Sequence, residues 1–339
     1  MPTARQRIVL AALAGGVVGT TAGSALVTWL TGRSRQPIDG LDTLNPPPGL
    51  PEAKIIPIPD RGEMFVRDHP GPAHGADHPP IVLLHGWLAS ADLNWFTNYE
   101  EMGKLARVIA PDHRGHGRGT RHSSPFRLAD VADDVAALIR HLDLGPSIIV
   151  GFSMGGPITQ LLWQRHPDVV AGVVLCSTAS EFRFGPLSGA QWRWMSVYQV
   201  GTRLLPRSWL EWALVAQLRG KLPVSITPVI SPEMEDAAPP IPWLVGEIER
   251  GDAEDVSEAG RELGRFDSRG WIGGMDRPAA VIVTTRDRLV PLTSQLELAA
   301  RIPHALITEV EGDHDAAAAN ATEFNAALQQ SVAYITDRL

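Results

Sequence analysis

The stretch Gly151-Phe152-Ser153-Met154-Gly155 follows a short apolar run, Ile148-Ile149-Val150, that is typical of a buried strand. Directly after it, the apolar residues recur at three- and four-residue spacings, as they do in a helix. In a Gly-x-Ser-x-Gly pattern of this kind, the sharp turn between strand and helix lifts a serine hydroxyl clear of the sheet. The glycines are needed because the strained turn takes backbone angles that only glycine reaches at little cost. Ser153 is therefore a candidate nucleophile.

Composition limits the classes of protein to which this chain can belong. It has 339 residues, of which 44% are hydrophobic, enough for a well-buried core. The net charge of −8 is not the basic footprint of a nucleic-acid binder, so no nucleic-acid partner is expected. The one cysteine, Cys176, lies in an apolar run and is interpreted as a buried core residue.

An uncharged stretch of 23 residues, Ile8 to Leu30, stands near the start of the chain, with two arginines close to each end. As a helix it would span about 35 Å, enough to cross the hydrocarbon core of a bilayer with some tilt. We expect residues 1–35 to be a membrane anchor that holds the large domain on the outer face. A signal peptide that is cleaved, leaving a secreted protein, is the alternative.

The rest of the chain divides into four segments. Residues 36–53 are rich in proline and glycine and are interpreted as a linker. Residues 54–179 alternate strand-like and helix-like runs, and the alternation returns in residues 279–339. This pattern predicts one α/β domain with a mostly parallel central sheet and helices on both faces. Residues 180–278 break the rhythm and hold six of the ten tryptophans, so we interpret them as an insertion into that domain.

A serine hydroxyl becomes a good nucleophile only when a base removes its proton, and a carboxylate helps by fixing the tautomer of that base. Reactive groups in parallel α/β sheets lie beyond the carboxyl ends of the strands. Asp287 and His314 each come just after a strand-like run. We therefore expect Ser153, Asp287 and His314 to form a catalytic triad, with Asp313 as the competing candidate for the acid.

Attack on a carbonyl group also requires N–H donors for the oxyanion that forms. The backbone N–H of Met154, at the start of the helix after the serine, is one candidate. The other is the N–H of Trp87 in the loop His85-Gly86-Trp87, and the Trp87 indole is expected to line the acyl side of the pocket. No metal or cofactor is expected, because His113 and His116 occupy a glycine-rich turn with no matching carboxylate cluster.

Four motifs together resemble the α/β-hydrolase superfamily, nearest to its serine esterase, haloperoxidase-like and C–C hydrolase branches. They are His85-Gly86-Trp87, residues 112–117, residues 151–156, and the pair Asp287 and His314. The resemblance covers residues 54–179 and 279–339. It implies an α/β-hydrolase fold, a Ser–His–Asp triad, and a largely helical cap formed by residues 180–278, whose Trp192 and Trp194 would line the pocket with Trp87.

These patterns predict a serine hydrolase of the carboxylesterase or lipase-like type, which cleaves small-molecule or lipid esters of apolar acyl groups through an acyl-enzyme. Two alternatives stay open. The same triad would also serve a C–C bond hydrolase or a perhydrolase. A chain that keeps the fold without the chemistry would be a non-catalytic, membrane-tethered binding protein.

Overall fold

The computed structural model describes residues 46–73, 75, 77–184 and 241–339. The predicted membrane span and two of the predicted pocket residues, Trp192 and Trp194, lie outside the described residues. Within the described ranges, no helix is long and apolar enough to cross a membrane. The anchor therefore stays a prediction from the sequence.

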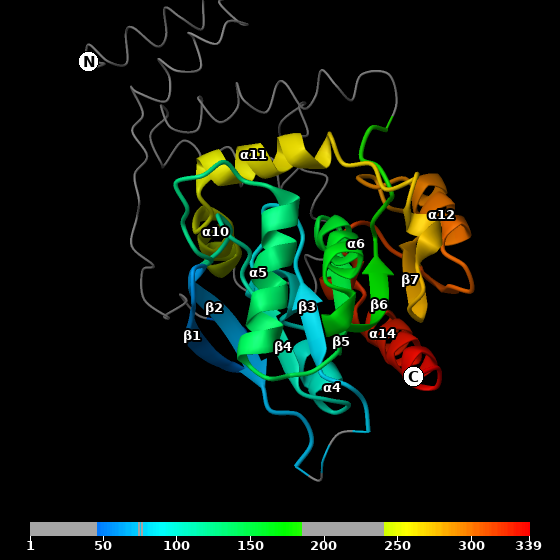
Figure 1. The fold of residues 1–339 in the computed structure, drawn as a ribbon, viewed down its shortest axis with the longest axis horizontal. Coiled ribbons are helices and arrows are strands. Elements are labelled where there is room, and N and C mark those ends of the chain that lie inside the picture. The colour runs from blue at the N-terminus through cyan, green and yellow to red at the C-terminus, as the bar shows by residue number, and fades with distance from the viewer. Residues whose placement is uncertain (1–45, 74, 76, 185–240) are drawn as a thin grey trace, which may run out of the picture.

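A sheet of eight strands, in the order β1-β2-β4-β3-β5-β6-β7-β8, forms the centre of the described part of the chain (Figure 1). β1 and β2 run antiparallel to their neighbours, and the strands from β4 to β8 along the sheet pair in parallel. The strands are β1 Glu52–Ile58, β2 Gly62–His69, β3 Ile81–Leu84, β4 Val108–Pro111, β5 Ser147–Phe152, β6 Val170–Cys176, β7 Ala279–Thr284 and β8 Leu306–Val310.

The central strands are buried on both faces, which explains why they are continuous apolar runs in the sequence. In β3, Ile81 and Leu83 belong to one hydrophobic core, whereas Val82 and Leu84 belong to the other. This division follows from the geometry of a strand, in which successive side chains point to opposite faces. All four side chains are fully buried.

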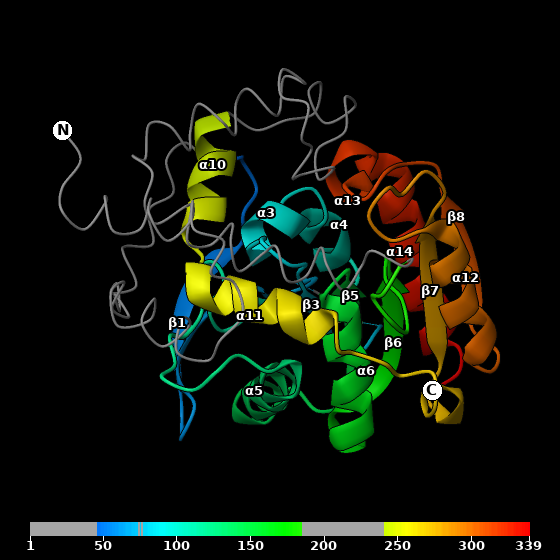
Figure 2. The same ribbon diagram turned by 90° about the horizontal axis from the view of Figure 1, so that it is seen from above.

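Helices cover both faces of the sheet (Figure 2). One core contains residues of α5, α6, α11 and α12, and the other contains residues of α3, α4, α13 and α14. These helices are α3 Ala91–Trp95, α4 Tyr99–Gly103, α5 Leu128–His141, α6 Gly155–Arg165, α11 Ala253–Leu263, α12 Leu292–Arg301, α13 Ala316–Ala319 and α14 Ala321–Thr336. The predicted α/β fold, with a mostly parallel sheet between two helical layers, is confirmed.

The predicted insertion lies between β6 and β7, and the described part of it is helical. It contains α10 (Ile241–Glu249), α11 and a short 3-10 helix, η2 (Ile272–Gly274). α11 lies across the end of the sheet toward which β6 points (Figure 1). The segment that follows β6 lies beside the segment that leads to β7, because Glu181 and Asp267 form an isolated antiparallel bridge. The exact boundaries of the insertion stay a prediction.

Candidate active site

Ser153 occupies the turn between β5 and α6, and its backbone is strained. Its φ angle is +52°, in the left-handed region that non-glycine residues rarely adopt. The turn is held by the neighbouring strand end, because the Ser153 N–H donates to the Cys176 carbonyl at 2.9 Å and the Thr178 hydroxyl donates to the Ser153 carbonyl at 2.7 Å. A Cβ atom at Gly155 would overlap the Leu84 carbonyl oxygen, so this glycine lets α6 start directly against β3.

The structure brings Ser153, His314 and Asp287 into one hydrogen-bonded line. His314 follows β8, Asp287 follows β7, and the two ring nitrogens of His314 lie 2.9 Å from Ser153 Oγ and 2.8 Å from Asp287 Oδ2. An ionised carboxylate can only accept, so the proton of the imidazole is on Nδ1, and Nε2 is left free to accept the serine hydroxyl. This is the arrangement that a base-activated serine requires.

The environment of Asp287 favours its ionised form. Burial alone would raise the pKa of this carboxyl group, but the nearby His314, the backbone N–H of Val290 and the hydroxyl of Thr284 outweigh burial and lower it. Oδ1 accepts hydrogen bonds from the N–H groups of Leu289 and Val290, both at 2.8 Å. The acid therefore stays charged and in place beside the imidazole.

Asp313, the competing candidate for the acid, bonds to backbone and to Arg288, whereas the imidazole of His314 bonds to Asp287 and Ser153. Its carboxylate accepts hydrogen bonds from the backbone N–H groups of Arg288 and His314, at 3.0 and 2.7 Å, and pairs with the Arg288 side chain. It therefore binds the two loops to each other, whereas Asp287 binds the ring.

The predicted oxyanion donors belong to two backbone segments next to Ser153. Met154 is the N-cap residue of α6, where the first N–H groups of a helix have no partner within the helix. Gly86, which precedes Trp87, packs so closely that a Cβ atom there would lie 3.3 Å from Ser153 Cβ. The two donors therefore belong to backbone segments beside Ser153, and their catalytic role stays a prediction.

Hydrogen bonds to Gly86 from His85 and Asn94 hold the peptide between Gly86 and Trp87 in one orientation. His85 Nδ1 donates to the Gly86 carbonyl at 2.8 Å, since its Nε2 already accepts the His113 N–H at 2.9 Å. On the other side of Gly86, its N–H donates to Asn94 Oδ1 at 2.9 Å. The carbonyl and N–H groups of a trans peptide point in opposite directions. The Trp87 N–H is therefore directed away from His85.

Comparison with known proteins identifies the family. The family model described as the alpha/beta hydrolase fold matches residues 79–320. The chain belongs to the α/β-hydrolase family. The predicted resemblance is thereby confirmed.

Several members of the α/β-hydrolase family are similar to this chain. The 3-oxoadipate enol-lactonase 2 of Acinetobacter baylyi is 24% identical over 258 residues, which are 75% of this chain and 88% of that protein. The bifunctional esterase/perhydrolase DCH of Acinetobacter calcoaceticus is 38% identical over 120 residues, 35% of this chain and 42% of that protein. A thermophilic esterase from Thermogutta terrifontis superposes with a TM-score of 0.67 at 21% identity, covering 84% of this chain and 99% of the other. This last likeness concerns the fold alone.

Two buried residues beside the acid of this hydrolase were missed by the sequence reasoning. Thr284, the last residue of β7, and Gln295, on α12, both donate hydrogen bonds to Asp287 Oδ2. The sequence held a signal for one of them. Gln295 stands on the helical stripe that includes Leu298 and Ile302, a polar residue where the pattern calls for an apolar one.

The described part of the cap is joined to the core by a buried ion pair. Arg118, from the loop after β4, binds both carboxylate oxygens of Glu247 on α10, at 2.6 and 3.0 Å. The Ser90 hydroxyl donates to the same carboxylate at 2.7 Å. Because burial removes these charges from water, each needs the other, and separating them would be costly. α10 is therefore held in place against the core.

The tryptophans of the predicted pocket have different positions. The Trp87 indole donates to the carbonyl of Val256 on α11 at 2.7 Å, so this side chain joins the loop after β3 to α11. Two cap tryptophans are described: Trp243 packs against Phe96, and Trp271 stacks on Trp163 of α6. Trp271 also packs edge-on against Phe266 of the predicted insertion, so these two side chains join the insertion to the core of the α/β-hydrolase domain. Trp192 and Trp194 lie outside the described residues.

Three buried histidines, His85, His113 and His116, lie in the loops after β3 and β4. The rings of His85 and His113 lie with their centroids 3.9 Å apart and their planes tilted by 30°, and the His116 ring centroid lies 5.8 Å from that of His85. Burial, the largest influence on each, lowers the pKa of all three, to about 4 for His85 and about 3 for His116. Among the residues that the structure describes, no group of three or more His, Cys, Asp and Glu side chains is arranged to hold a metal ion.

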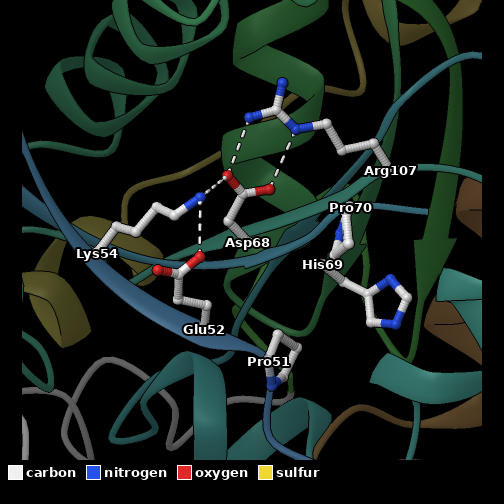
Figure 3. Close-up of a pocket in the computed structure, with 7 residues that line it drawn as sticks. All are labelled: Pro51, Glu52, Lys54, Asp68, His69, Pro70 and Arg107. Atoms are coloured by element: carbon white, nitrogen blue, oxygen red, sulfur yellow. Dashed lines mark hydrogen bonds and ion pairs between the residues drawn. The ribbon is translucent and has the colours of Figure 1, made fainter.

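A surface hollow of about 410 Å³ lies at the opposite end of the parallel strands, near the start of β4 (Figure 3). Asp68 at its centre pairs with Lys54 at 2.8 Å and with Arg107 at 2.9 Å. The hollow is lined by Pro51, Glu52, Lys54, Asp68, His69, Pro70 and Arg107. Glu52 also pairs with Lys54, at 3.2 Å, so two acidic and two basic side chains balance in charge. Since the hollow also lies away from the carboxyl ends of the strands, we assign it no part in the chemistry of Ser153.

Proposed function

We propose that this member of the α/β-hydrolase family is a serine hydrolase that cleaves carboxylic esters of apolar acyl groups. The observation that carries the proposal is the continuous line of hydrogen bonds from Ser153 through His314 to Asp287, with distances of 2.9 and 2.8 Å. The names of two relatives, an esterase/perhydrolase and an enol-lactonase, are consistent with an acyl substrate.

The first step forms an acyl-enzyme. Ser153 Oγ attacks the ester carbonyl carbon while its proton passes to His314 Nε2, and the Asp287 carboxylate stabilises the imidazolium through Nδ1. The oxygen of the carbonyl takes up negative charge, and the N–H groups of Met154 and Trp87 stabilise it. His314 then gives the proton to the leaving alcohol as the carbon–oxygen bond breaks.

The second step removes the acyl group. Water takes the place of the alcohol and loses a proton to His314 Nε2 as its oxygen attacks the acyl carbon. Collapse of the second tetrahedral intermediate returns the proton to Ser153 Oγ and releases the carboxylic acid. The chain's own residues supply every proton transfer in this cycle.

An apolar acyl group is proposed because aromatic side chains belong to the segments that carry Ser153 and the predicted oxyanion donor Trp87. The Trp87 side chain is partly buried and packs against the main core, and the Phe152 ring lies with its centroid 5.2 Å from that of His314. Pockets for small ligands are lined mainly by apolar and aromatic side chains that bury most of the ligand surface. We therefore expect the rate of ester hydrolysis to change with acyl length across a homologous series of esters.

The test uses the purified protein, a fluorophosphonate probe and p-nitrophenyl esters of increasing acyl length. We expect the probe to label the wild-type protein and a matched Ser124→Ala control, an exposed loop serine, but not Ser153→Ala. Ester turnover should fall by at least about 10⁴-fold in Ser153→Ala. Undiminished ester hydrolysis by Ser153→Ala would refute the proposal.

The same experiment separates the alternatives. A panel of β-diketones and a peracid-forming assay, run beside the esters, would redirect the proposal to C–C cleavage or perhydrolysis if either turnover exceeded that of the esters. A wild-type protein that the probe does not label would favour a non-catalytic binding protein.

We also propose that Ile8–Leu30 anchors the protein in a membrane with the hydrolase domain on the outer face. The support is its length, 23 residues without a charge. Carbonate extraction and protease accessibility of the full chain test this. Recovery of a protein shortened at its N-terminus from the soluble fraction would indicate a cleaved signal peptide instead.

A further inference from the structure

The carboxylate of Asp287 receives more hydrogen bonds than the triad needs. Beyond the two backbone N–H groups on Oδ1, Oδ2 accepts from three side chains. His314 Nδ1 and Thr284 Oγ1 each lie at 2.8 Å, and Gln295 Nε2 lies at 3.2 Å. Thr284, Gln295 and the Asp287 side chain are all buried, so these bonds form away from bulk water. Hydrogen bonds to a charged group in such surroundings are strong.

Gln295 is fixed at both ends of its amide by backbone groups. Its Oε1 accepts the Thr284 N–H at 3.0 Å, and its Nε2 donates to the Val290 carbonyl at 2.8 Å. These partners determine which end of the amide is oxygen, since a backbone N–H can only donate and a carbonyl can only accept. The Gln295 side chain is thus hydrogen-bonded to both ends of the segment 284–290, which carries Asp287.

Thr284 links Gln295 to the acid. Gln295 Nε2 lies 3.1 Å from Thr284 Oγ1, which in turn donates to Asp287 Oδ2, and Ser177 at the end of β6 lies 3.2 Å from the same hydroxyl. The set therefore joins β6, β7 and α12 behind the carboxylate.

We propose that Thr284 and Gln295 are positioning residues that limit how strongly Asp287 holds the protonated form of His314, and thereby set the pH range in which His314 acts as a base. This inference rests on the proposed serine hydrolase function. It concerns two residues that touch neither the substrate nor the nucleophile and act only through Asp287.

The physical reason is the sharing of one negative charge. Donors on Oδ2 stabilise the carboxylate before His314 is protonated, so less stabilisation remains for the imidazolium. The imidazolium then gives up its proton more readily, and the free base persists at lower pH. The same bonds hold the carboxylate in the position that keeps the imidazole directed at Ser153, which favours catalysis.

The other charged groups around the acid do not produce this effect. Among the described residues, His314 is the titratable group hydrogen-bonded to the Asp287 carboxylate. Arg288 and Asp313, the charged neighbours of these two residues in the chain, pair with each other, and the Arg288 side chain is half-exposed. From β7 and α12, the neutral groups of Thr284 and Gln295 bond to it, and the Ser177 hydroxyl after β6 bonds to Thr284 Oγ1. The proposal therefore depends on those neutral donors.

The experiment compares the variants Thr284→Val and Gln295→Met, which keep side-chain size but remove the donors. Two rates are measured from pH 4.5 to 9: the kcat/KM of ester hydrolysis and the labelling of Ser153 by the fluorophosphonate. The acid limb of each profile, where the rate falls as pH decreases, reports the protonation of the base in the free enzyme. We expect the limb to move to higher pH by about half a unit or more in each variant, and kcat to fall by about tenfold.

Two further variants separate positioning from general stability. Thr284→Ser restores the hydroxyl and should restore the wild-type acid limb. Gln160→Met removes another fully buried glutamine, which bonds to the Ala179 carbonyl and the Ser268 hydroxyl, and it should leave the limb unchanged. Thermal melting of each variant verifies the fold, and if Gln295→Met does not fold, Thr284→Val decides the question.

Folded variants with the wild-type acid limb would overturn the inference while leaving the serine hydrolase assignment intact. A wild-type protein that neither labels nor turns over esters would overturn both. An acid limb that moves equally in Gln160→Met would show a general effect of buried substitutions and would also refute the positioning role.

Discussion

Two groups of histidines lie beyond the carboxyl ends of the strands, and they differ in what their rings bind. His314 bonds to two side chains, the Asp287 carboxylate and the Ser153 hydroxyl. His85, His113 and His116 each bond through a ring nitrogen to a backbone carbonyl, at 2.8 to 3.1 Å. A carboxylate stabilises the imidazolium, whereas a carbonyl in a buried site fixes only a neutral tautomer.

Position at a strand end therefore does not by itself make a histidine a base. In the buried group, a second proton would have no acceptor: among the described atoms, His113 Nδ1 and His116 Nε2 have no hydrogen-bond partner. An additional buried N–H without a partner is costly, so these rings stay neutral. They are suited to hold backbone in place, and His314 is suited to exchange a proton with Ser153.

The largest effect is expected at His314. Replacing it in His314→Ala removes the base and should lower kcat by about 10⁴-fold or more, since the members of a triad act as one unit. The matched control is His141→Ala, an exposed histidine at the end of α5, which should retain activity. Steady-state kinetics on one ester measure both. Similar activity in the two variants would remove the distinction between the histidine groups.

A smaller effect is expected at His85, because this residue orients the Trp87 N–H and takes no part in proton transfer. In His85→Leu the Gly86 carbonyl loses its partner, so the following N–H is no longer fixed, and kcat should fall by about 10²-fold with little change in KM. His85→Asn places an amide donor near the position of Nδ1 and should recover part of the loss. Equal activity of wild type and His85→Leu would mean that the Gly86–Trp87 peptide needs no support from the ring.

The sequence predicted the sheet and the three residues of the hydrogen-bonded line because both depend on local patterns. Apolar runs mark buried strands, and parallel strands direct their following loops to one edge, so Asp287 and His314 could be placed beside Ser153. The choice between Asp287 and Asp313 needed the structure, because it depends on which way a loop directs its side chains. Arg118 and Glu247 stand 129 residues apart, and no local pattern pairs them.

The buried histidines should also make stability depend on pH. Their pKa values are lowered in the fold, so as pH falls below about 6.5 the unfolded chain binds protons that the folded chain does not, and stability is lost until the folded pKa is reached. Each histidine contributes at most about 1.4 kcal/mol per pH unit to the slope. Urea unfolding between pH 7.5 and 5 should show a shallower slope for His116→Asn than for the wild type. Parallel slopes would indicate that His116 is protonated in the fold.

The smallest effect is expected at Asp313, the neighbour of the base. In Asp313→Asn the side-chain amide oxygen can still accept the N–H groups of Arg288 and His314, so only the ion pair with the half-exposed Arg288 side chain is lost. Surface ion pairs contribute about 0–1 kcal/mol, and kcat/KM should therefore change by less than about threefold. The matched Asp287→Asn should lose about 10⁴-fold, because an amide no longer fixes the required tautomer of His314. Equal losses in the two variants would mean that either carboxylate can serve the ring, although Asp287 is the one that lies 2.8 Å from it.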